Sequence, residues 1–263
     1  MPESYFHVRC ARRAYQKCGA RGYDIPSVIA GSAGPDILFY YIGLPPLTFL
    51  GQRMHRERCG PFLTALVRRA DSLTLRSYVL GFLSHNAADT TLHPWVKRSG
   101  LPHAAAESAL DSFCLLRDSG RGIVEAADSA ARLTREKRLE IGGLLSEAIR
   151  EVYGVRVSRG ALAGAIEDFR RCRGWLRDPK RRKARLAGGA ERLLRLEAGT
   201  LAGHLTPGGP LDATEELEEQ MAQAEDLAAE LMSAAQSWWA GELGPLELER
   251  RIGDRPYNGE NRI

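Results

Sequence analysis

Side chains that bind metal ions recur at one-turn spacing between residues 81 and 107, in the segment GFLSHNAADTTLHPWVKRSGLPHAAAE. His85, Asp89 and His93 occupy positions i, i+4 and i+8, so a helix would stack all three along one face. Imidazole nitrogens and carboxylate oxygens on successive turns are ligands that suit a borderline cation such as zinc. The spacing therefore predicts a metal site on a helix.

A second pair with the same spacing follows after a turn. His103 and Glu107 stand four residues apart, just beyond Pro102. Pro94 disfavours continuation of the first helix, so His93 is expected to lie at the end of that helix. A single pair of this kind is usually an ordinary surface or core feature, because short motifs match by chance. Two of them so close together, in a chain with six histidines, favour metal binding.

A carboxylate earlier in the chain is a further candidate. Asp36 follows a Gly-Pro pair and precedes the apolar, aromatic run 37–42. A carboxylate that enters such a run needs a partner, because burying a bare charge is costly. Its side chain can either cap a helix that begins at Ile37 or bind a metal ion, and the local sequence leaves both roles open.

The elements that must position these residues are predicted to be helices. A first helix at 4–18, with Ser4 as N-cap, carries His7, and a helix at 47–70, interrupted near Gly60-Pro61, carries His55. Each of these histidines alone would indicate a structural role more readily than a metal ligand. Apolar periodicity predicts further helices at 72–93, beginning with Ser72, and at 103–117, 123–152, 158–177, 180–197 and 213–241.

Composition and charge limit the class of protein. The chain has 263 residues, 44% of them hydrophobic, which is enough for one large domain with a sizeable core. A net charge of +4 does not by itself indicate nucleic-acid binding. No apolar run is long enough for a transmembrane helix, and the charged start MPESYFHVRCARRAYQKCG lacks the apolar core of a signal peptide. Five scattered cysteines without a CxxC motif also fit a reduced, cytoplasmic protein.

The predicted organisation is all-α, with a multi-helix single domain. Residues 1–120 form the metal-binding helical core, and residues 121–263 add helices that pack on it, with a linker near 204–211. Lys and Arg concentrate in 170–195, whereas 196–249 contains neither. We favour two antiparallel helices that complement each other in charge. The alternative is a basic surface for phosphate or anionic lipid, centred on DPKRRKAR.

Taken together, several of these segments resemble one known family. The segments are MPESYFHVRCA, GPDILFYY, GQRMH, GFLSHNAADTTLHPW and HAAAESALD, and in order and spacing they resemble the bacterial zinc-dependent phospholipase C family. The resemblance covers roughly residues 1–115. It implies an all-α fold with the three-zinc architecture that this family shares with fungal single-strand nucleases.

The resemblance also implies a distribution of ligands over two or three zinc ions. One zinc would take Asp36, His55, His85 and Asp89; a second would take His93, His103 and Glu107; a third would take His7 and Asp89, with Asp89 bridging. Manganese or iron can occupy sites with such ligands as well. Secreted members complete the third zinc with an N-terminal Trp, whereas six residues precede His7 here.

The function implied is hydrolysis of a phosphodiester. Zinc lowers the pKa of bound water toward about 7, and the resulting hydroxide would attack phosphorus, with Asp36 as a candidate general base and Asp89 also catalytic. The substrate would be a phospholipid or another phosphodiester, with peripheral membrane contact. The aromatic side chains nearest the candidate ligands in sequence, which we consider for substrate contact, are Phe39, Tyr40, Tyr41 and Trp95.

Two alternatives remain open from the sequence. A nuclease or nucleotide phosphohydrolase on the same scaffold would suit a cytoplasmic protein with a basic segment at 170–195. A non-catalytic, metal-stabilised helical protein that binds partners through its acidic helix at 212–240 is the other alternative. Zinc that never exchanges, with no open coordination position, would favour that last alternative.

Overall fold

The computed structural model describes residues 5–120, 131–176, 178, 180, 182–196, 205 and 214–258. Within these ranges all regular structure is helical and no strand occurs, which confirms the all-α prediction. No helix in the same ranges combines the length and apolarity needed to cross a bilayer. The predicted N-cap Ser4, the start of the helix expected at 123–152 and the linker near 204–211, except Leu205, lie outside the described residues.

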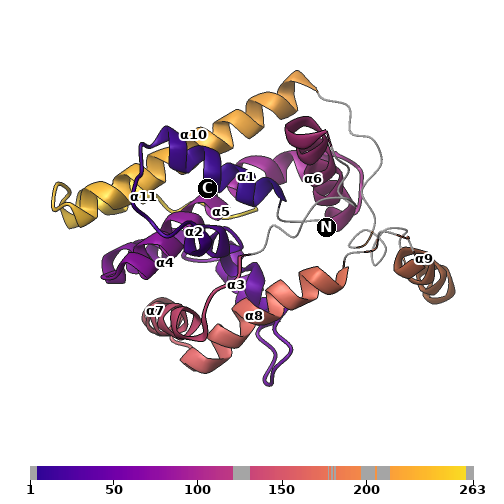
Figure 1. Cartoon of the computed structure of the whole chain (residues 1–263), viewed down its shortest axis with the longest axis horizontal. Coiled ribbons are helices and arrows are strands. Elements are labelled where there is room, and N and C mark those ends of the chain that lie inside the picture. The colour runs from indigo at the N-terminus through magenta and orange to yellow at the C-terminus, as the bar shows by residue number, and fades with distance from the viewer. Residues whose placement is uncertain are drawn as a thin grey trace.

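The helices follow one another along the chain in the order shown in Figure 1. A single 3₁₀ turn, η1 (Gly34–Leu38), interrupts the described α-helices, which are α1 (Tyr5–Lys17), α2 (Ile25–Gly31), α3 (Thr48–Arg56), α4 (Cys59–Arg69), α5 (Leu73–Arg98), α6 (His103–Ser119), α7 (Arg135–Tyr153), α8 (Arg159–Leu176), α9 (Arg182–Leu194), α10 (Glu215–Trp239) and α11 (Pro245–Ile252).

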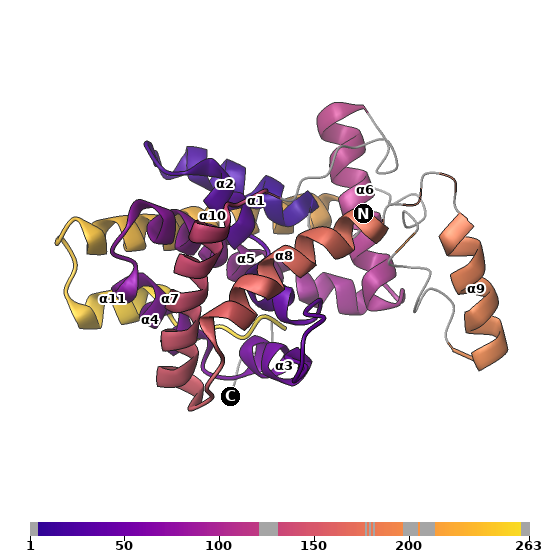
Figure 2. The ribbon, with the colours of Figure 1, turned by 60° about the horizontal axis from the view of Figure 1, so that its bottom comes forward.

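Helix α5 forms the centre of the fold. It packs against α10, α2 and α1, and it passes through the middle of the molecule in Figures 1 and 2. Ser72 caps it as predicted, because its Oγ accepts a hydrogen bond from Leu75 N at 3.2 Å. Every residue from Ser77 to Asp89 is buried, so the polar side chains of this stretch must find partners inside the protein.

Two glycines allow α2 and α5 to cross at close range. A Cβ atom on Gly31 would lie 2.0 Å from the carbonyl oxygen of Tyr78, and one on Gly81 would lie 2.0 Å from that of Val28. Any side chain at either position would push the helices apart. The close crossing places the end of α2 against the segment of α5 that carries the predicted ligands.

The prediction that the central helix ends at His93 is wrong. α5 continues through Pro94 to Arg98. Proline in a helix interior removes one backbone N–H, so the carbonyl of Thr90 loses its usual partner. Burial of Leu92 and Val96 on either side of Pro94, each 3% exposed, favours continuation of the helix.

Other local predictions also need correction. Asp36 is not the N-cap of a helix over 37–42, because it lies inside η1, where Ala33 is the N-cap. The helix expected at 47–70 is two helices, and the break lies at Arg58, which has a left-handed φ of 52°. The Gly60-Pro61 pair instead falls in the first turn of α4, where the missing N–H of proline is tolerated.

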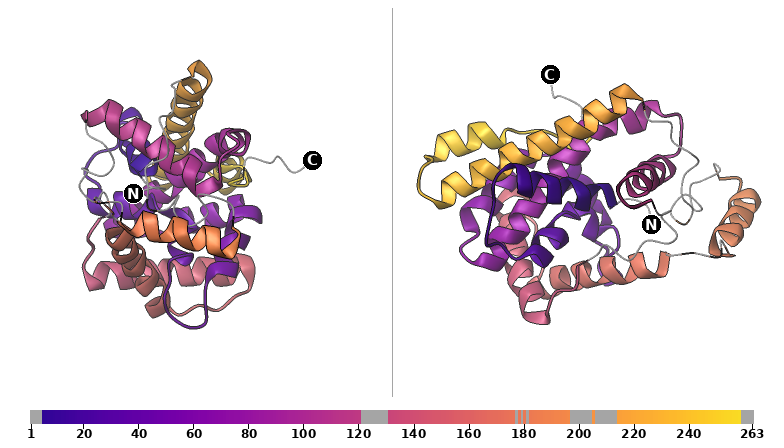
Figure 3. Two further views of the ribbon diagram at one scale, coloured as in Figure 1. Left: turned by 90° about the vertical axis from the view of Figure 1, so that its right-hand side faces the viewer. Right: turned by 45° about the horizontal axis from the view of Figure 1, so that its top comes forward.

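The acidic side chains of α10 pair with helices other than the basic segment 170–195. Their ion-pair partners lie on α1, α5 and α6, in the pairs Arg9–Glu225 at 2.6 Å, Lys17–Asp226 at 2.8 Å, Arg98–Glu216 at 2.5 Å and Arg117–Glu218 at 2.8 Å. Helix α9, in the basic segment, stands at one end of the molecule in Figures 1 and 2 and in the right-hand view of Figure 3. The favoured interpretation of complementary antiparallel helices therefore does not describe α10.

Candidate metal centre

All eight predicted ligands are described, and they converge from five elements. α1 contributes His7, η1 contributes Asp36, α3 contributes His55, α5 contributes three ligands and α6 contributes the remaining two. Their ligand atoms fall into three groups, in each of which the atoms lie within 4.8 Å of one another: His7, His85 and Asp89; Asp36, His55 and His85; and His93, His103 and Glu107.

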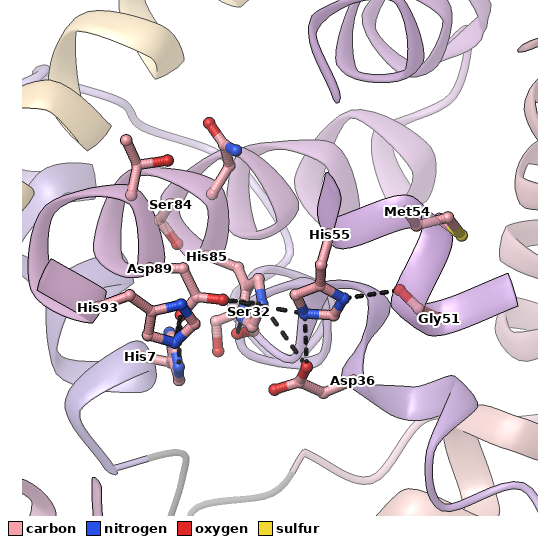
Figure 4. A network of polar contacts seen from close by, with 12 residues as sticks. His7, Ser32, Asp36, Gly51, Met54, His55, Ser84, His85, Asp89 and His93 are labelled. Atoms are coloured by element: carbon pink, nitrogen blue, oxygen red, sulfur yellow. Dashed lines mark hydrogen bonds and ion pairs between the residues drawn. The ribbon is translucent and has the colours of Figure 1, made fainter. Parts of the chain in front are cut away.

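The group of Asp36, His55 and His85 joins η1, α3 and α5. His55 Nε2 lies 3.0 Å from Asp36 Oδ1, and His85 Nε2 lies 3.9 Å from the same oxygen. Figure 4 shows these imidazoles and the carboxylate pointing toward a common point. Asp36 and His55 are separated by 19 residues, so only the tertiary fold brings them together.

The group of His93, His103 and Glu107 joins α5 to the start of α6. His103 Nε2 lies 2.9 Å from Glu107 Oε1, and His93 Nε2 lies 3.3 Å from that oxygen. The i, i+4 spacing on α6 produces the first contact, as the sequence pattern predicts. The side chain of His103 is 58% exposed, whereas that of Glu107 is 16% exposed, so this group opens to solvent through His103.

Asp89 connects the groups through its two carboxylate oxygens. Oδ2 lies 3.2 Å from His85 Nε2 and 3.9 Å from His55 Nε2. Oδ1 lies 3.3 Å from His7 Nε2 and 3.7 Å from His93 Nε2. A carboxylate with different histidines at each oxygen is suited to bridge two cations, because it offsets the repulsion between them.

Two backbone carbonyls fix the orientation of His55 and His85. His85 Nδ1 donates to Ser32 O at 3.0 Å, and His55 Nδ1 donates to Gly51 O at 2.7 Å. A carbonyl only accepts, so each Nδ1 carries a proton and each Nε2 in the neutral ring has a free lone pair. Metal-binding histidines are typically held in this way.

Burial and neighbouring charges shift the pKa values of the histidines and of Asp89 in this cluster. Burial lowers the pKa of His85, but the charges of Asp89 and Asp36 outweigh burial and raise it to about 9. Burial and the neighbouring His85 lower the pKa of His7 to about 4. Burial raises the pKa of Asp89, but His85, His93 and His7 outweigh that effect and hold it well below its usual value. The Asp89 carboxylate is therefore ionised at neutral pH and needs positive charge beside it.

The donor set fits zinc. His85 Nε2 is fully enclosed and faces Asp89 without the alignment of a hydrogen bond, and buried His7 Nδ1 also makes none. A buried polar atom without a partner is costly, and a metal ion between His85 Nε2 and the Asp89 carboxylate would remove that cost at His85. Nitrogen and oxygen ligands without thiolate are compatible with zinc at a catalytic site.

Two residues that the sequence analysis did not identify support this arrangement. Gly34 has φ +52°, and a Cβ there would lie 2.2 Å from His85 Cδ2. Asp111 of α6 caps α1, since Oδ2 accepts from Tyr5 N at 2.9 Å and Oδ1 accepts from Phe6 N at 2.8 Å. The glycine of the GPD segment was visible in the sequence as a signal, whereas nothing local marked Asp111 as the cap of a distant helix.

A cleft opens onto the three groups. Its volume is about 1070 Å³, and it exposes ligands from each group. Apolar and basic side chains share its walls, namely Phe39, Tyr40, Arg56, Lys97, Pro102, Trp175, Leu176 and Leu205. Tyr41 and Trp95, which were also candidates for substrate contact, pack against the hydrophobic core. Asn258, near the C-terminus, lines the cleft as well.

Comparison with known proteins gives one match. A family model described as zinc dependent phospholipase C matches residues 6–157. This range includes all eight predicted ligands. A search of curated proteins found no match, and a search of solved structures found none either. The order of the ligands, the all-helical fold and a family match over more than half of the chain agree, and the chain therefore belongs to the zinc-dependent phospholipase C family.

Proposed function

We propose that this chain is a zinc-dependent phosphodiester hydrolase of the phospholipase C type. The observation that carries the proposal is the position of three ligand groups along one cleft of about 1070 Å³. The ligands would be distributed as the family resemblance implies, with Asp89 shared between groups. When bound, zinc ions there would acidify water and neutralise the oxygens of a phosphate group.

Asp36 is the carboxylate best placed to take a proton from water. It lines the cleft, and its side chain is 19% exposed, whereas that of Asp89 is 5% exposed. Asp36 Oδ1 lies 3.0 Å from His55 Nε2, which places the carboxylate beside the ligand atoms of α3 and α5. The water oxygen forms a bond to phosphorus and loses a proton to Asp36, while the bond from phosphorus to the alcohol oxygen breaks. Asp36 then returns that proton, which the departing alkoxide takes up to leave as the alcohol.

The cleft composition supports an amphiphilic phosphodiester as substrate. Arg56 and Lys97 supply positive charge on its walls, and Phe39, Trp175 and Leu176 supply apolar surface. A phospholipid has an anionic phosphate beside an apolar glycerol ester portion, so both kinds of wall would be used.

Helix α9 supports access to lipid at a membrane surface. Leu186 and Leu193, seven residues apart on one face, are 76% and 83% exposed. Lys183, Arg185 and the last-turn Arg192 flank that face, and Ala187 of the same helix lines the cleft. Exposed leucines beside basic side chains suit peripheral binding to anionic lipid. We propose that α9 contacts the membrane next to the cleft.

The decisive experiment compares substrates on zinc-loaded protein. Phosphatidylcholine vesicles, a soluble p-nitrophenyl phosphodiester and single-stranded DNA would be tested side by side. The proposal expects turnover of the lipid and the soluble diester, and it expects Asp36→Asn to lower kcat by about 10²- to 10⁴-fold, the usual contribution of a general base. Asp71→Asn, which changes an exposed carboxylate before α5, serves as the matched control.

One alternative is favoured by a specific observation. The basic α9 and Trp175, which is 66% exposed, could also bind phosphates and stack a base of single-stranded nucleic acid. Cleavage of DNA without cleavage of phosphatidylcholine would select a nuclease. Stoichiometric zinc with no hydrolysis of any of the three substrates would contradict both enzymes and leave a metal-stabilised binding protein.

A further inference from the structure

The C-terminal segment 253–258 crosses α5 beside the predicted ligands. Asn86 Nδ2 donates to Arg255 O at 3.1 Å, and Thr90 Oγ1 donates to Pro256 O at 3.2 Å. Each of these donors directly follows a predicted ligand in the sequence. The same two turns of α5 therefore present ligands to the metal centre and polar side chains to the C-terminal segment.

Tyr257 inserts from this segment against two of the histidines. It is 1% exposed, and its N–H donates to His55 O at 3.0 Å. The centroid of its ring lies 5.0 Å from that of His55 and 5.6 Å from that of His85, with interplanar angles of 56° and 48°. One side chain thus packs on both imidazoles of the group that contains Asp36.

The path of the segment is fixed upstream as well. Asp254 Oδ1 accepts a hydrogen bond from Gly60 N at 2.7 Å. Gly253 has a left-handed φ of 66°, and a Cβ on Gly60 would lie 2.0 Å from the Gly253 carbonyl oxygen. These close contacts therefore restrict the position of Tyr257.

We propose that Tyr257 is a positioning residue of the metal centre. A hydrogen bond from Nδ1 to a carbonyl fixes one atom of each imidazole, but it does not fix the tilt of the ring about that atom. The ring of Tyr257 restricts this tilt for His55 and His85 together, so that both Nε2 lone pairs face the Asp36 carboxylate. The segment 253–258 thereby completes a centre whose other residues all lie within the family match at 6–157.

The inference rests on the proposed function for its kinetic consequence, but its metal-binding part needs no substrate. Tyr257→Leu, Tyr257→Phe and Tyr153→Leu would be compared by chelator competition for zinc and by the visible spectrum of the cobalt-substituted protein. Tyr153 is the matched control, since it is also buried but packs on Phe62 and Arg53, away from the ligands.

We expect Tyr257→Leu to weaken zinc binding by about 10- to 100-fold, as for other residues that orient metal ligands. The cobalt bands should shift, and kcat for the soluble diester should fall more than KM rises. Tyr257→Phe should resemble the wild type because it keeps the ring. Tyr153→Leu should lower the Tm while it leaves zinc affinity and the cobalt spectrum unchanged.

A folded Tyr257→Leu protein with wild-type zinc affinity and cobalt spectrum would overturn the inference. If that variant does not fold, Thr90→Val removes one hydrogen bond to the segment and should weaken zinc about threefold, the effect of a typical hydrogen bond. Unchanged zinc binding in Thr90→Val would then count against the inference. A wild-type protein that binds zinc but cleaves no phosphodiester would contradict only the proposed function.

Discussion

Asp89 Oδ2 lies 3.2 Å from His85 Nε2, and both side chains leave the same helix one turn apart. Asp89 Oδ1 faces His7 of α1 and His93 on the next turn of α5, and Oδ2 also lies 3.9 Å from His55 Nε2, so this carboxylate faces four of the predicted histidine ligands. Local helix geometry places the contacts with His85 and His93, whereas the tertiary positions of α1 and α3 relative to α5 place those with His7 and His55.

Replacement of Asp89 should therefore affect more than one ion. Asp89→Asn keeps the volume but removes the negative charge that the surrounding imidazoles require. We expect loss of at least one zinc per chain and a fall in kcat/KM of more than about a hundredfold, larger than the effect of residues that only orient ligands. Elemental analysis and diester assays would check this, and full zinc with full turnover would refute the bridging role.

Gly34 offers a test of how closely the backbone approaches His85. Gly34→Ala puts a Cβ 2.2 Å from the imidazole and forces a left-handed φ of 52° on alanine. Gly154→Ala imposes the same kind of backbone strain at φ +69° but meets no atom within 4 Å. Both should lose about 1–2 kcal/mol of stability from the strain, whereas only Gly34→Ala should also lose zinc. Equal zinc contents in the two variants would argue against the tight contact.

Asp111 should stabilise α1 and thereby position His7. Asp111→Ala leaves two buried N–H groups at the start of α1 without their acceptor, which should cost about 2–4 kcal/mol in the free energy of unfolding. Thr214→Ala removes the N-cap of α10 and should cost about 1 kcal/mol without changing zinc stoichiometry. Urea titrations with zinc analysis would compare them, and equal losses would show that Asp111 is an ordinary cap.

Removal of metal should destabilise the fold. The rings of His7 and His85 stack with centroids 4.3 Å apart beside ionised carboxylates, an arrangement that a cation holds together. Zinc at a hundred times its dissociation constant should add about 2.7 kcal/mol of stability per site, and chelation should lower the Tm accordingly. Calorimetry over a series of zinc concentrations would check this. A Tm independent of zinc would mean that the site does not bind the ion preferentially in the folded state.

Asp24 should give the fold a pH dependence away from the metal centre. Burial raises its pKa, but hydrogen bonds from Lys137 at 2.8 Å and from Ser27 outweigh burial, so the folded-state pKa lies below the ordinary 3.8. A group whose folded pKa is depressed stabilises the protein above its unfolded pKa and loses that contribution as pH falls through the folded pKa.

The stability gap between wild type and Asp24→Asn should therefore be constant near neutral pH and should close below about pH 4. Urea unfolding at several pH values would measure it. A gap that widened as the pH fell would contradict the pairing with Lys137.

The sequence by itself determined the local part of this protein. Helical periodicity placed α5 and α6, and the i, i+4 spacings placed Asp89 beside His85 and Glu107 beside His103 before any tertiary contact was known. The N-cap of α5 at Ser72 could also be predicted from the sequence, because a cap depends only on neighbouring residues.

Only the tertiary structure decided which residues meet across elements. The close crossing of α2 and α5 at Gly31 and Gly81 places the carbonyl of Ser32 against His85. The C-terminal segment 253–258 places Tyr257 against the same imidazole ring. The burial of residues on both sides of Pro94 also keeps this proline inside α5, whereas local rules predict that the helix ends before it. Periodicity encodes which face of a helix a side chain occupies, whereas the partner of that face depends on packing among segments far apart in the chain.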